Sequence, residues 1–362
     1  MKIWRLAYGV MAAVALLAGC GGGLQSPSSV AAWTGQGLAS GGRGLGPMEH
    51  HLATYTSVLT PKVNPDHHKS WVSPDVKRAH HVLFISDDSS GDVYIFTLPA
   101  LQLKGTLTGF NGPQGMCQDK QGNIWVVNTG TSQGLKYART GKLLGSVSDP
   151  FGTPAGCAVN PTNGDLALSE TRGASSSGAG GVEVYKNGSG SPTRYSNPSQ
   201  YEYYFPAYDT DGNLYVDGFS YPTFAVMISE LPSGKRRMHT VNYSGGTIQY
   251  PGGVNWDRVK SQLVINDQEC QGLYASCVYQ LTVSGSSATI VGSTPLNNFD
   301  GTACDVDQGT ITPFSKYFAG PCITFAYSVS SVGRWAYPSG GTPGHYNDSV
   351  VVEPIGSAIS SK

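Results

Sequence analysis

Charged residues are scarce in this 362-residue sequence: Asp, Glu, Lys and Arg together make up 13% of it, and the formal net charge is −1. A chain with so little charge of either sign gives no electrostatic reason to expect nucleic acid as a partner. No apolar run is long enough to span a bilayer. Helical patterns are scarce as well, whereas 48 glycines and 22 prolines favour many turns and short strands.

Several signatures of catalytic chemistry are also missing. The sequence contains no Gly-x-Ser-x-Gly turn and no phosphate-binding loop between a strand and a helix. The histidine pairs His67-His68 and His80-His81 have no partner at a metal-binding spacing. These absences argue against a serine hydrolase of that type, a nucleotide-binding enzyme and a histidine-rich metal site.

The N-terminus has the layout of a secretory signal. Lys2 and Arg5 precede a short, mostly apolar run, Leu6 to Leu17, and Cys20 follows shortly after it. The residues Leu17-Ala18-Gly19-Cys20 resemble the lipobox of bacterial lipoproteins. The resemblance implies cleavage before Cys20 and a lipid on its sulfur, whereas an ordinary signal peptide with an incidental cysteine is the alternative. We therefore expect export and a membrane-anchored lipoprotein, periplasmic or at the cell surface.

The chain divides into four predicted parts. Residues 1–19 form the signal peptide, and residues 20–65, rich in Gly, Ser and Ala, form a flexible tether. A β-rich domain is expected over residues 66–340. The tail, residues 341–362, is expected to add an edge strand or to hang free.

One hairpin pattern recurs along the β-rich part. Gly112–Gly130 reads as a strand, a turn and a second strand, and similar segments follow at a spacing of about 48 residues. Two further strand-like runs follow most hairpins, so the unit has four antiparallel strands. Six such units predict an all-β, six-bladed β-propeller with four-stranded antiparallel blades. Aligned on one inner-strand position, the six segments give Val72, Gln118, Val159, Tyr208, Trp256 and Cys304.

The phrase Gly-Pro-x-Gly, then Asp, then Gly-Asn-Ile/Leu-Trp/Tyr-Val resembles the NHL-repeat and streptogramin-lyase-like group of six-bladed propellers. Gly112–Val126 carries the whole phrase, and Asp211–Val216 carries its second half. The resemblance implies the fold. It does not fix an activity, because this fold is found in lactonases, lyases and binding modules.

The cysteines fit an exported protein. Seven are present, and removal of Cys20 as the lipid site leaves an even set of six. Sequence alone does not fix their connectivity, but the blade layout suggests one. A bridge between neighbouring inner strands, a clip across a loop of blade five and a bridge within blade six would be Cys117–Cys157, Cys270–Cys277 and Cys304–Cys322.

Polar residues recur where one face of the propeller is expected. In each blade the second strand ends on the face where the inner strand begins. The predicted polar ring on that face comprises Asp87, Gln114, Asn128, Glu170, Asp217, Asp267 and Asp300. Oxygen ligands at this density suit Ca²⁺ or Mg²⁺, or a polyol such as a sugar. The alternative is structural, because Asp and Asn at strand ends also cap turns through their own backbone.

Blade four adds aromatic residues to the same face. Tyr204 precedes its inner strand and Tyr221 follows its second strand. Aromatic rings beside carboxylates suit sugar binding or protein recognition, and packing between blades is the alternative.

We therefore predict a cell-envelope binding protein that holds a protein or glycan partner on this face. The alternative is a divalent-metal-dependent hydrolase or lyase, and a third possibility is a structural module of a cell-envelope complex. The lactonase branch of the resemblance implies metal ligands at inner-strand starts. The corresponding positions here are Gln114, Ala155, Gly252 and Asp300, of which only Asp300 has suitable chemistry. No His lies where the lyase branch would need one, so the sequence leans against an enzyme, and Ca²⁺ is the one cofactor left open.

Overall fold

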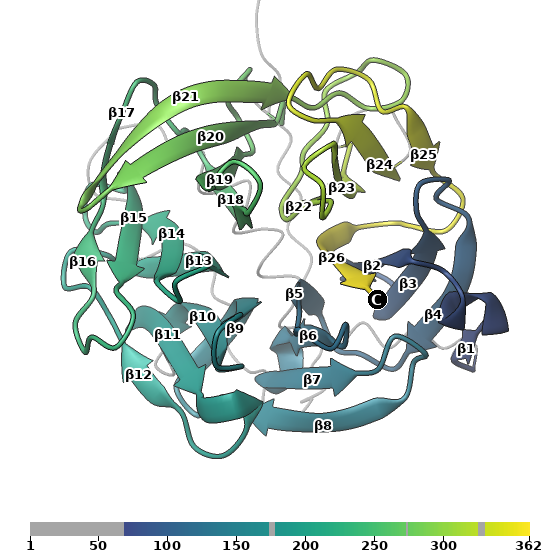
Figure 1. Cartoon of the computed structure of the whole chain (residues 1–362), viewed down its shortest axis with the longest axis horizontal. Helices are drawn as coiled ribbons and strands as arrows, with labels where there is room; N and C mark the ends of the chain where they lie inside the picture. The colour runs from purple at the N-terminus through teal and green to yellow at the C-terminus, as the bar shows by residue number, and fades with distance from the viewer. Residues whose placement is uncertain (1–68, 174–177, 273, 325–329) are drawn as a thin grey trace, which may run out of the picture. The chain divides into compact units, whose positions relative to one another are not determined.

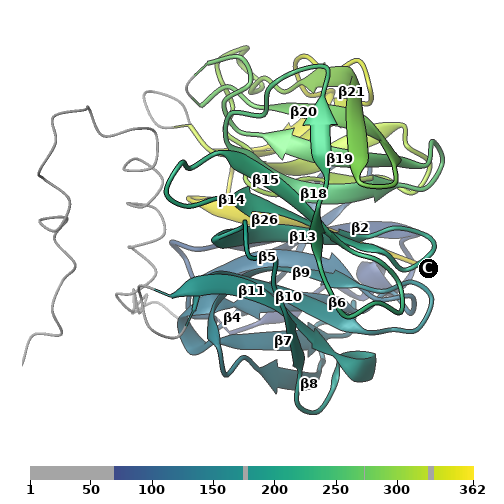
Figure 2. The same ribbon diagram turned by 90° about the vertical axis from the view of Figure 1, so that its left-hand side faces the viewer.

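The computed structural model describes residues 69–173, 178–272, 274–324 and 330–362, all within the unit His50–Lys362. These residues form six β-sheets arranged radially around an axis (Figure 1). Figure 2 views the same sheets from the side. The prediction of an all-β, six-bladed propeller is confirmed. The helical segments in the described ranges are short 3-10 turns, η1 (Pro74–Lys77), η2 (Thr129–Thr131) and η3 (Lys186–Gly188), and no helix there is long and apolar enough to cross a membrane.

The first three sheets, named blades one to three, have four or five strands each. Blade one contains, from its outer edge inward, β1 (Trp71–Val72), β4 (Leu103–Thr108), β3 (Asp92–Thr97), β2 (His81–Asp87) and β26 (Pro354–Ser361). Blade two contains, from the axis outward, β5 (Pro113–Gln118), β6 (Ile124–Asn128), β7 (Gln133–Tyr137) and β8 (Leu143–Ser148). Blade three contains, in the same direction, β9 (Gly152–Val159), β10 (Leu166–Gly173), β11 (Ala179–Tyr185) and β12 (Thr193–Tyr195).

Blades four to six complete the ring. Blade four contains β13 (Glu202–Tyr208), β14 (Leu214–Phe219), β15 (Val226–Leu231) and β16 (His239–Thr240). Blade five contains β18 (Pro251–Asp257), β19 (Gln262–Asp267), β20 (Cys277–Ser284), β21 (Ser287–Pro295) and, parallel to β21 at the edge, β17 (Asn242–Ser244). Blade six contains β22 (Thr310–Ile311), β23 (Tyr317–Cys322), β24 (Ser331–Ala336) and β25 (His345–Asn347).

The C-terminal strand closes the ring. β26 pairs with β2 as the innermost strand of blade one (Figure 1). The predicted tail, residues 341–362, therefore supplies the inner edge strand of blade one, and the propeller extends beyond the boundary expected at residue 340. Val72, aligned as an inner-strand residue, lies instead in the outermost strand, opposite Gly105. A sequence signal existed, because Pro354-Ile355-Gly356 repeats the Pro-x-Gly phrase of Pro113-Gln114-Gly115.

Blade six also departs from its predicted register. Thr310–Ile311 is the inner strand of this blade and pairs with β23. A bridge between Asp305 and Ile323 extends this pairing toward the start of the blade. The inner segment therefore begins several residues later in the chain than the alignment on Cys304 assumed.

Three disulfides are present, and their pairing matches the prediction. The Cα–Cα distances are 5.6 Å for Cys117–Cys157, 5.9 Å for Cys270–Cys277 and 5.2 Å for Cys304–Cys322. The Asp305–Ile323 bridge explains the last pair, because it places Cys304 and Cys322 on adjacent segments. Disulfides of this number indicate an oxidising compartment outside the cytoplasm.

Neighbouring blades cover the two faces of each sheet. In the Gly112–Gly130 hairpin, Ile124 and Val126 pack in a cluster with Phe84 of blade one. Trp125 and Val127, on the other face, pack in a cluster with residues of blade three. Each fully buried side chain of this size contributes about 1.5–3 kcal/mol. Successive side chains of this strand therefore point to opposite faces of the sheet, and a neighbouring blade covers each face. A hairpin alone could not bury both faces.

Glycines permit close approach of the inner strands near the axis. A Cβ on Gly115 would lie 2.5 Å from the Ala155 carbonyl oxygen of the next blade. A Cβ on Gly156 would lie 2.6 Å from the Tyr204 carbonyl oxygen. Because these oxygens belong to the backbone, an added side chain would have to push the blades apart. This explains why glycine occupies the last position of the Pro-x-Gly phrase.

Candidate functional site on the entry face

Strand pairing brings three residues of the predicted polar ring to the same side of the propeller. Asp87 lies opposite Pro354, Asn128 opposite Pro113, and Asp267 opposite Pro251. The ends of the second strands therefore adjoin the starts of the inner strands. We call this side of the molecule the entry face.

Two aspartates of the predicted ring cap backbone at this face. Asp267 accepts hydrogen bonds from the backbone N–H groups of Gln249, Tyr250 and Glu269, at 2.8, 3.0 and 3.0 Å. Asp87 accepts from the backbone of Ser90 and of two residues just before β26. Both carboxylates are fully buried, and burial raises the pKa of each despite these hydrogen bonds. Their geometry is that of structural caps.

Asn128 and Asp217 serve the same purpose in blades two and four. The Asn128 side-chain oxygen accepts a 2.7 Å hydrogen bond from the Asn111 backbone N–H. Asp217 accepts one at 3.0 Å from the Phe205 backbone N–H, and complete burial raises its pKa well above the usual range. The turn-capping interpretation of the sequence accounts for these positions.

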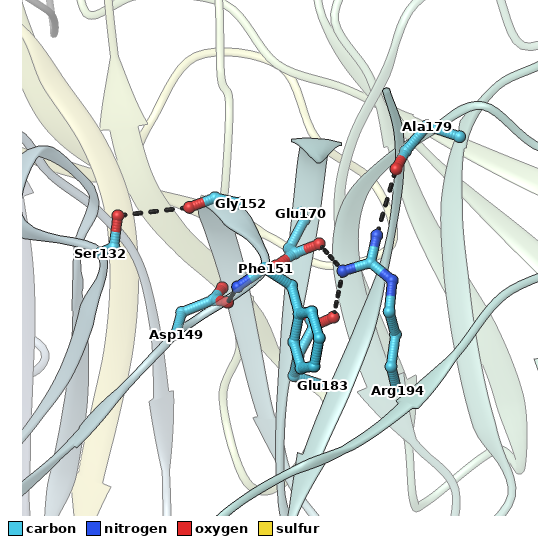
Figure 3. A network of polar contacts seen from close by, with 8 residues as sticks. All are labelled: Ser132, Asp149, Phe151, Gly152, Glu170, Ala179, Glu183 and Arg194. Carbon is cyan, nitrogen blue, oxygen red and sulfur yellow. Dashed lines mark hydrogen bonds and ion pairs between the residues drawn. The ribbon is translucent and has the colours of Figure 1, made fainter. Parts of the chain in front are cut away.

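Glu170 occupies the equivalent region of blade three but binds a side chain instead of backbone. It forms an ion pair with Arg194, which also contacts Glu183 at 2.6 Å (Figure 3). Burial, with the nearby carboxylates of Asp149 and Glu183, raises the pKa of Glu170 to about 10. Burial and the charge of Asp149 raise the pKa of Glu183 to about 8.

Asp300 does not lie at the start of an inner strand, so its alignment with the other blades was wrong. It is exposed in the segment that precedes blade six, and it accepts hydrogen bonds from the backbone and hydroxyl of Thr302. The residue at the equivalent position of blade six is Asp307. Its carbonyl accepts a 2.6 Å hydrogen bond from the Gly253 N–H of blade five, and the following residue, Gln308, donates to the Ile355 carbonyl of blade one.

One residue per blade thus occupies the first position beside the axis. The contacts between consecutive inner strands identify these residues as Ile355, Gln114, Ala155, Tyr204, Gly252 and Asp307. Gln308, the next residue in blade six, links inner strands across the ring. Its side-chain oxygen accepts from Met116 N–H at 2.8 Å, and its NH₂ group donates to the Met116 carbonyl at 3.0 Å.

Acidic residues outside the predicted polar ring influence the pKa of Asp307 and of its neighbour Asp305. Burial, and then the charges of Glu353 and Asp88, raise the pKa of Asp307 to about 7. Burial and the charges of Asp307 and Glu269 raise the pKa of Asp305 well above its usual range. We call these five residues the axial acidic group: Asp88, Glu269, Asp305, Asp307 and Glu353. Within the described chain, no Lys or Arg is among the charges that shift the pKa of Asp305 or Asp307.

The two predicted aromatic residues have different environments. Tyr204 is buried, and its hydroxyl donates to Glu202 at 3.1 Å while its ring packs edge-on against Tyr250. Tyr221 is 59% exposed, and its ring lies 5.1 Å from that of Tyr201 and 5.6 Å from that of Phe224. Tyr201, Tyr221 and Phe224 form what we call the blade-four aromatic cluster. Tyr204 is therefore a packing residue, whereas Tyr221 is available to a partner.

A pocket of about 300 Å³ lies away from these residues. Lys260, Gln280 and Ser293 of blade five and Pro338 of blade six are among its lining residues. It contains none of the predicted site residues.

Comparisons with known proteins reveal similarity in structure but not in sequence family. No protein-family model matches the sequence, and no curated protein matches it. A chain of the nidogen/laminin complex aligns with a TM-score of 0.55 and 12% identity over 77% of this chain and 98% of that one. A protein of unknown function from Bacteroides caccae aligns with a TM-score of 0.56 and 13% identity, over 78% of this chain and 100% of that one.

TolB from Acinetobacter baumannii aligns with a TM-score of 0.54 and 12% identity, over 80% of this chain and 68% of that one. At such identities the similarity concerns the fold. The protein is thus a six-bladed β-propeller that resembles the nidogen and TolB propellers in structure.

Proposed function

We propose that this protein is a cell-envelope lipoprotein whose entry face binds a basic segment of a partner protein. The observation that carries the proposal is the axial acidic group, whose five residues directly follow second strands or precede inner strands and so lie on the entry face. Carboxylates concentrated in a poorly solvated region attract cationic groups more strongly than scattered surface charges do.

The blade-four aromatic cluster supports recognition on the same face. Tyr221 and Phe224 are 59% and 41% exposed and contact each other edge to face. Aromatic rings are enriched in protein interfaces, and they attract Lys and Arg side chains through cation–π contacts. Among structures of this fold, one is described as a nidogen/laminin complex, which agrees with protein binding as a use of the fold.

The test is direct binding of a labelled hexa-arginine peptide, followed by fluorescence anisotropy at low and high salt. We expect salt-sensitive binding that weakens at least tenfold in Asp307→Asn combined with Glu353→Gln. Asp211→Asn removes an exposed carboxylate at a hairpin on the opposite face and should leave the affinity unchanged. Equal binding by all three proteins, or no binding by the wild type, contradicts the proposal. Binding of neutral glycans that depends on Tyr221, without peptide binding, would favour a glycan partner instead.

The lipid anchor is a separate part of the proposal. Cys20 and the rest of the lipobox-like segment lie outside the described residues, so the support comes from their sequence and from the disulfides. Mass spectrometry of the membrane fraction should find a lipid on Cys20, and Cys20→Ser should release the protein from the membrane. A soluble wild-type protein without lipid would contradict this part.

A metal-dependent hydrolase or lyase of the lactonase and streptogramin-lyase-like group is the second candidate. The observation that favours it is Asp307, a buried acid whose pKa of about 7 suits proton transfer near neutrality. Ala155 and Gly252, at the other axial positions, offer no side-chain ligand. Calcium-dependent hydrolysis of a panel of lactones, lost in Asp307→Asn, would support this candidate, and inactivity on the panel would count against it.

A further inference from the structure

Blade three holds a second acidic cluster, separate from the axial acidic group. It comprises Asp149, just before β9, Glu170 on β10 and Glu183 on β11, with Arg194 on β12 beside them (Figure 3). One carboxylate oxygen from each acid lies within 4.8 Å of the corresponding oxygens of the other two. The strands of one blade and the segment that enters it therefore bring three anionic groups to one point.

Arg194 satisfies only part of this cluster. Its guanidinium contacts one oxygen of Glu170 and one of Glu183, and it also donates to the Ala179 carbonyl. Asp149 accepts one hydrogen bond, from the Phe151 N–H at 2.8 Å. Three carboxylates thus face one guanidinium, which leaves two excess negative charges when all are ionised.

The remaining carboxylate oxygens of the cluster lack hydrogen-bond donors within the described residues. Within the described ranges, Glu170 Oε1, Glu183 Oε2 and Asp149 Oδ2 are buried and accept no hydrogen bond. Glu170 and Glu183 are 0% exposed and Asp149 is 7% exposed. A buried carboxylate oxygen without a donor is costly. Each of these three acids carries one, and the acids bring an oxygen apiece within 4.8 Å of one another, which a positive ion beside them explains most simply.

We propose that Asp149, Glu170 and Glu183 bind a hard divalent cation, with Ca²⁺ as the preferred ion. Calcium–oxygen distances of about 2.3–2.6 Å let one ion contact oxygens separated by up to about 5 Å. The two positive charges balance the two excess negative charges of the cluster. All of these ligands are oxygen atoms, which Ca²⁺ prefers, whereas Zn²⁺ sites in proteins usually contain Cys or His. Water molecules would complete the coordination of the ion.

Tyr185 provides a local optical reporter of this site. It is fully buried in blade three, its hydroxyl donates to the Ser148 carbonyl next to Asp149, and it lies within electrostatic range of all three acids. Tb³⁺, which binds oxygen-rich calcium sites, should therefore show luminescence sensitised by Tyr185. Tyr185→Phe should lose most of this signal while it retains calcium binding.

The decisive experiment is calorimetric titration of the EDTA-treated full chain with CaCl₂. We expect Ca²⁺ to bind and to raise the melting temperature, and Asp149→Asn and Glu183→Gln each to weaken binding at least tenfold. Asp348→Asn, which removes an exposed carboxylate, should leave this binding intact. Melting curves in EDTA establish that each variant folds.

Two results would overturn the proposal. One is the absence of calcium binding by the wild type, which would mean that a proton shared between carboxyl groups takes the place of the ion. The other is calcium binding that survives in both Asp149→Asn and Glu183→Gln. Neither result bears on peptide binding by the axial acidic group, so the two proposals fail separately.

Discussion

Asp267 and Asp307 are both buried aspartates on the entry face, but their surroundings differ in kind. Asp267 accepts three backbone hydrogen bonds, two of which hold the segment that leads into blade five and one the turn that follows β19. Asp307 has no such set among the described contacts, and its neighbours include the acids Glu353 and Asp88. The same residue type therefore holds the fold together in one place and concentrates negative charge in the other.

The largest expected effect comes from removal of the Asp267 cap. Asp267→Ala leaves three backbone N–H groups without their acceptor, two of them in buried hydrogen bonds, so we expect the free energy of unfolding to fall by about 3 kcal/mol. Urea denaturation of the variant measures this loss. Asp267→Asn retains an acceptor oxygen and should lose less. A change below about 0.5 kcal/mol in Asp267→Ala would mean that the cap contributes little.

Substitution of Asp307 should raise the stability of the fold instead of lowering it, and the size of this effect should depend on pH. Its pKa is about 7 in the folded protein against an ordinary value of 3.8, so the folded state binds the proton more tightly. The stability that this proton supplies is complete below about pH 4 and is lost as the pH rises toward 7. Asp307→Asn removes the ionisation.

We therefore expect Asp307→Asn to be more stable than the wild type at pH 8, by on the order of 1 kcal/mol or more, and similar to it at pH 4. Melting temperatures measured across this range give the comparison. A variant that is equally destabilised at both pH values would show that the Asp307 carboxyl group is needed for packing and that its ionisation does not destabilise the fold.

The smallest effect on stability is expected at Tyr221. Because this side chain is 59% exposed, Tyr221→Ala should change the free energy of unfolding by less than about 0.5 kcal/mol. Binding of the hexa-arginine peptide should nevertheless weaken several-fold. Tyr204→Ala is the contrasting variant, since loss of a buried aromatic ring should cost about 3–5 kcal/mol. If Tyr221→Ala binds as the wild type does, the aromatic cluster takes no part in recognition.

The candidate site was only partly predictable from sequence. Asp87, Asn128 and Asp267 end second strands, and Asp217 lies two residues before the end of one, in strands whose sequence pattern is clear. Their role as caps, however, depends on which backbone N–H groups they meet. Asp307 was missed because the hairpin pattern of blade six is weak, so Asp300 was aligned in its place.

The sequence by itself determined the repeating unit and the number of blades, because alternation within strands and spacing between hairpins are local properties of the chain. Only the tertiary structure decided how the ring closes. The backbone N–H of Gly356 in β26 donates a hydrogen bond to the Ser86 hydroxyl, 270 residues earlier in the chain. No local sequence pattern specifies such a distant partner. It also decided which buried carboxylates are satisfied by backbone and which face one another, because that depends on packing between segments that are distant in sequence.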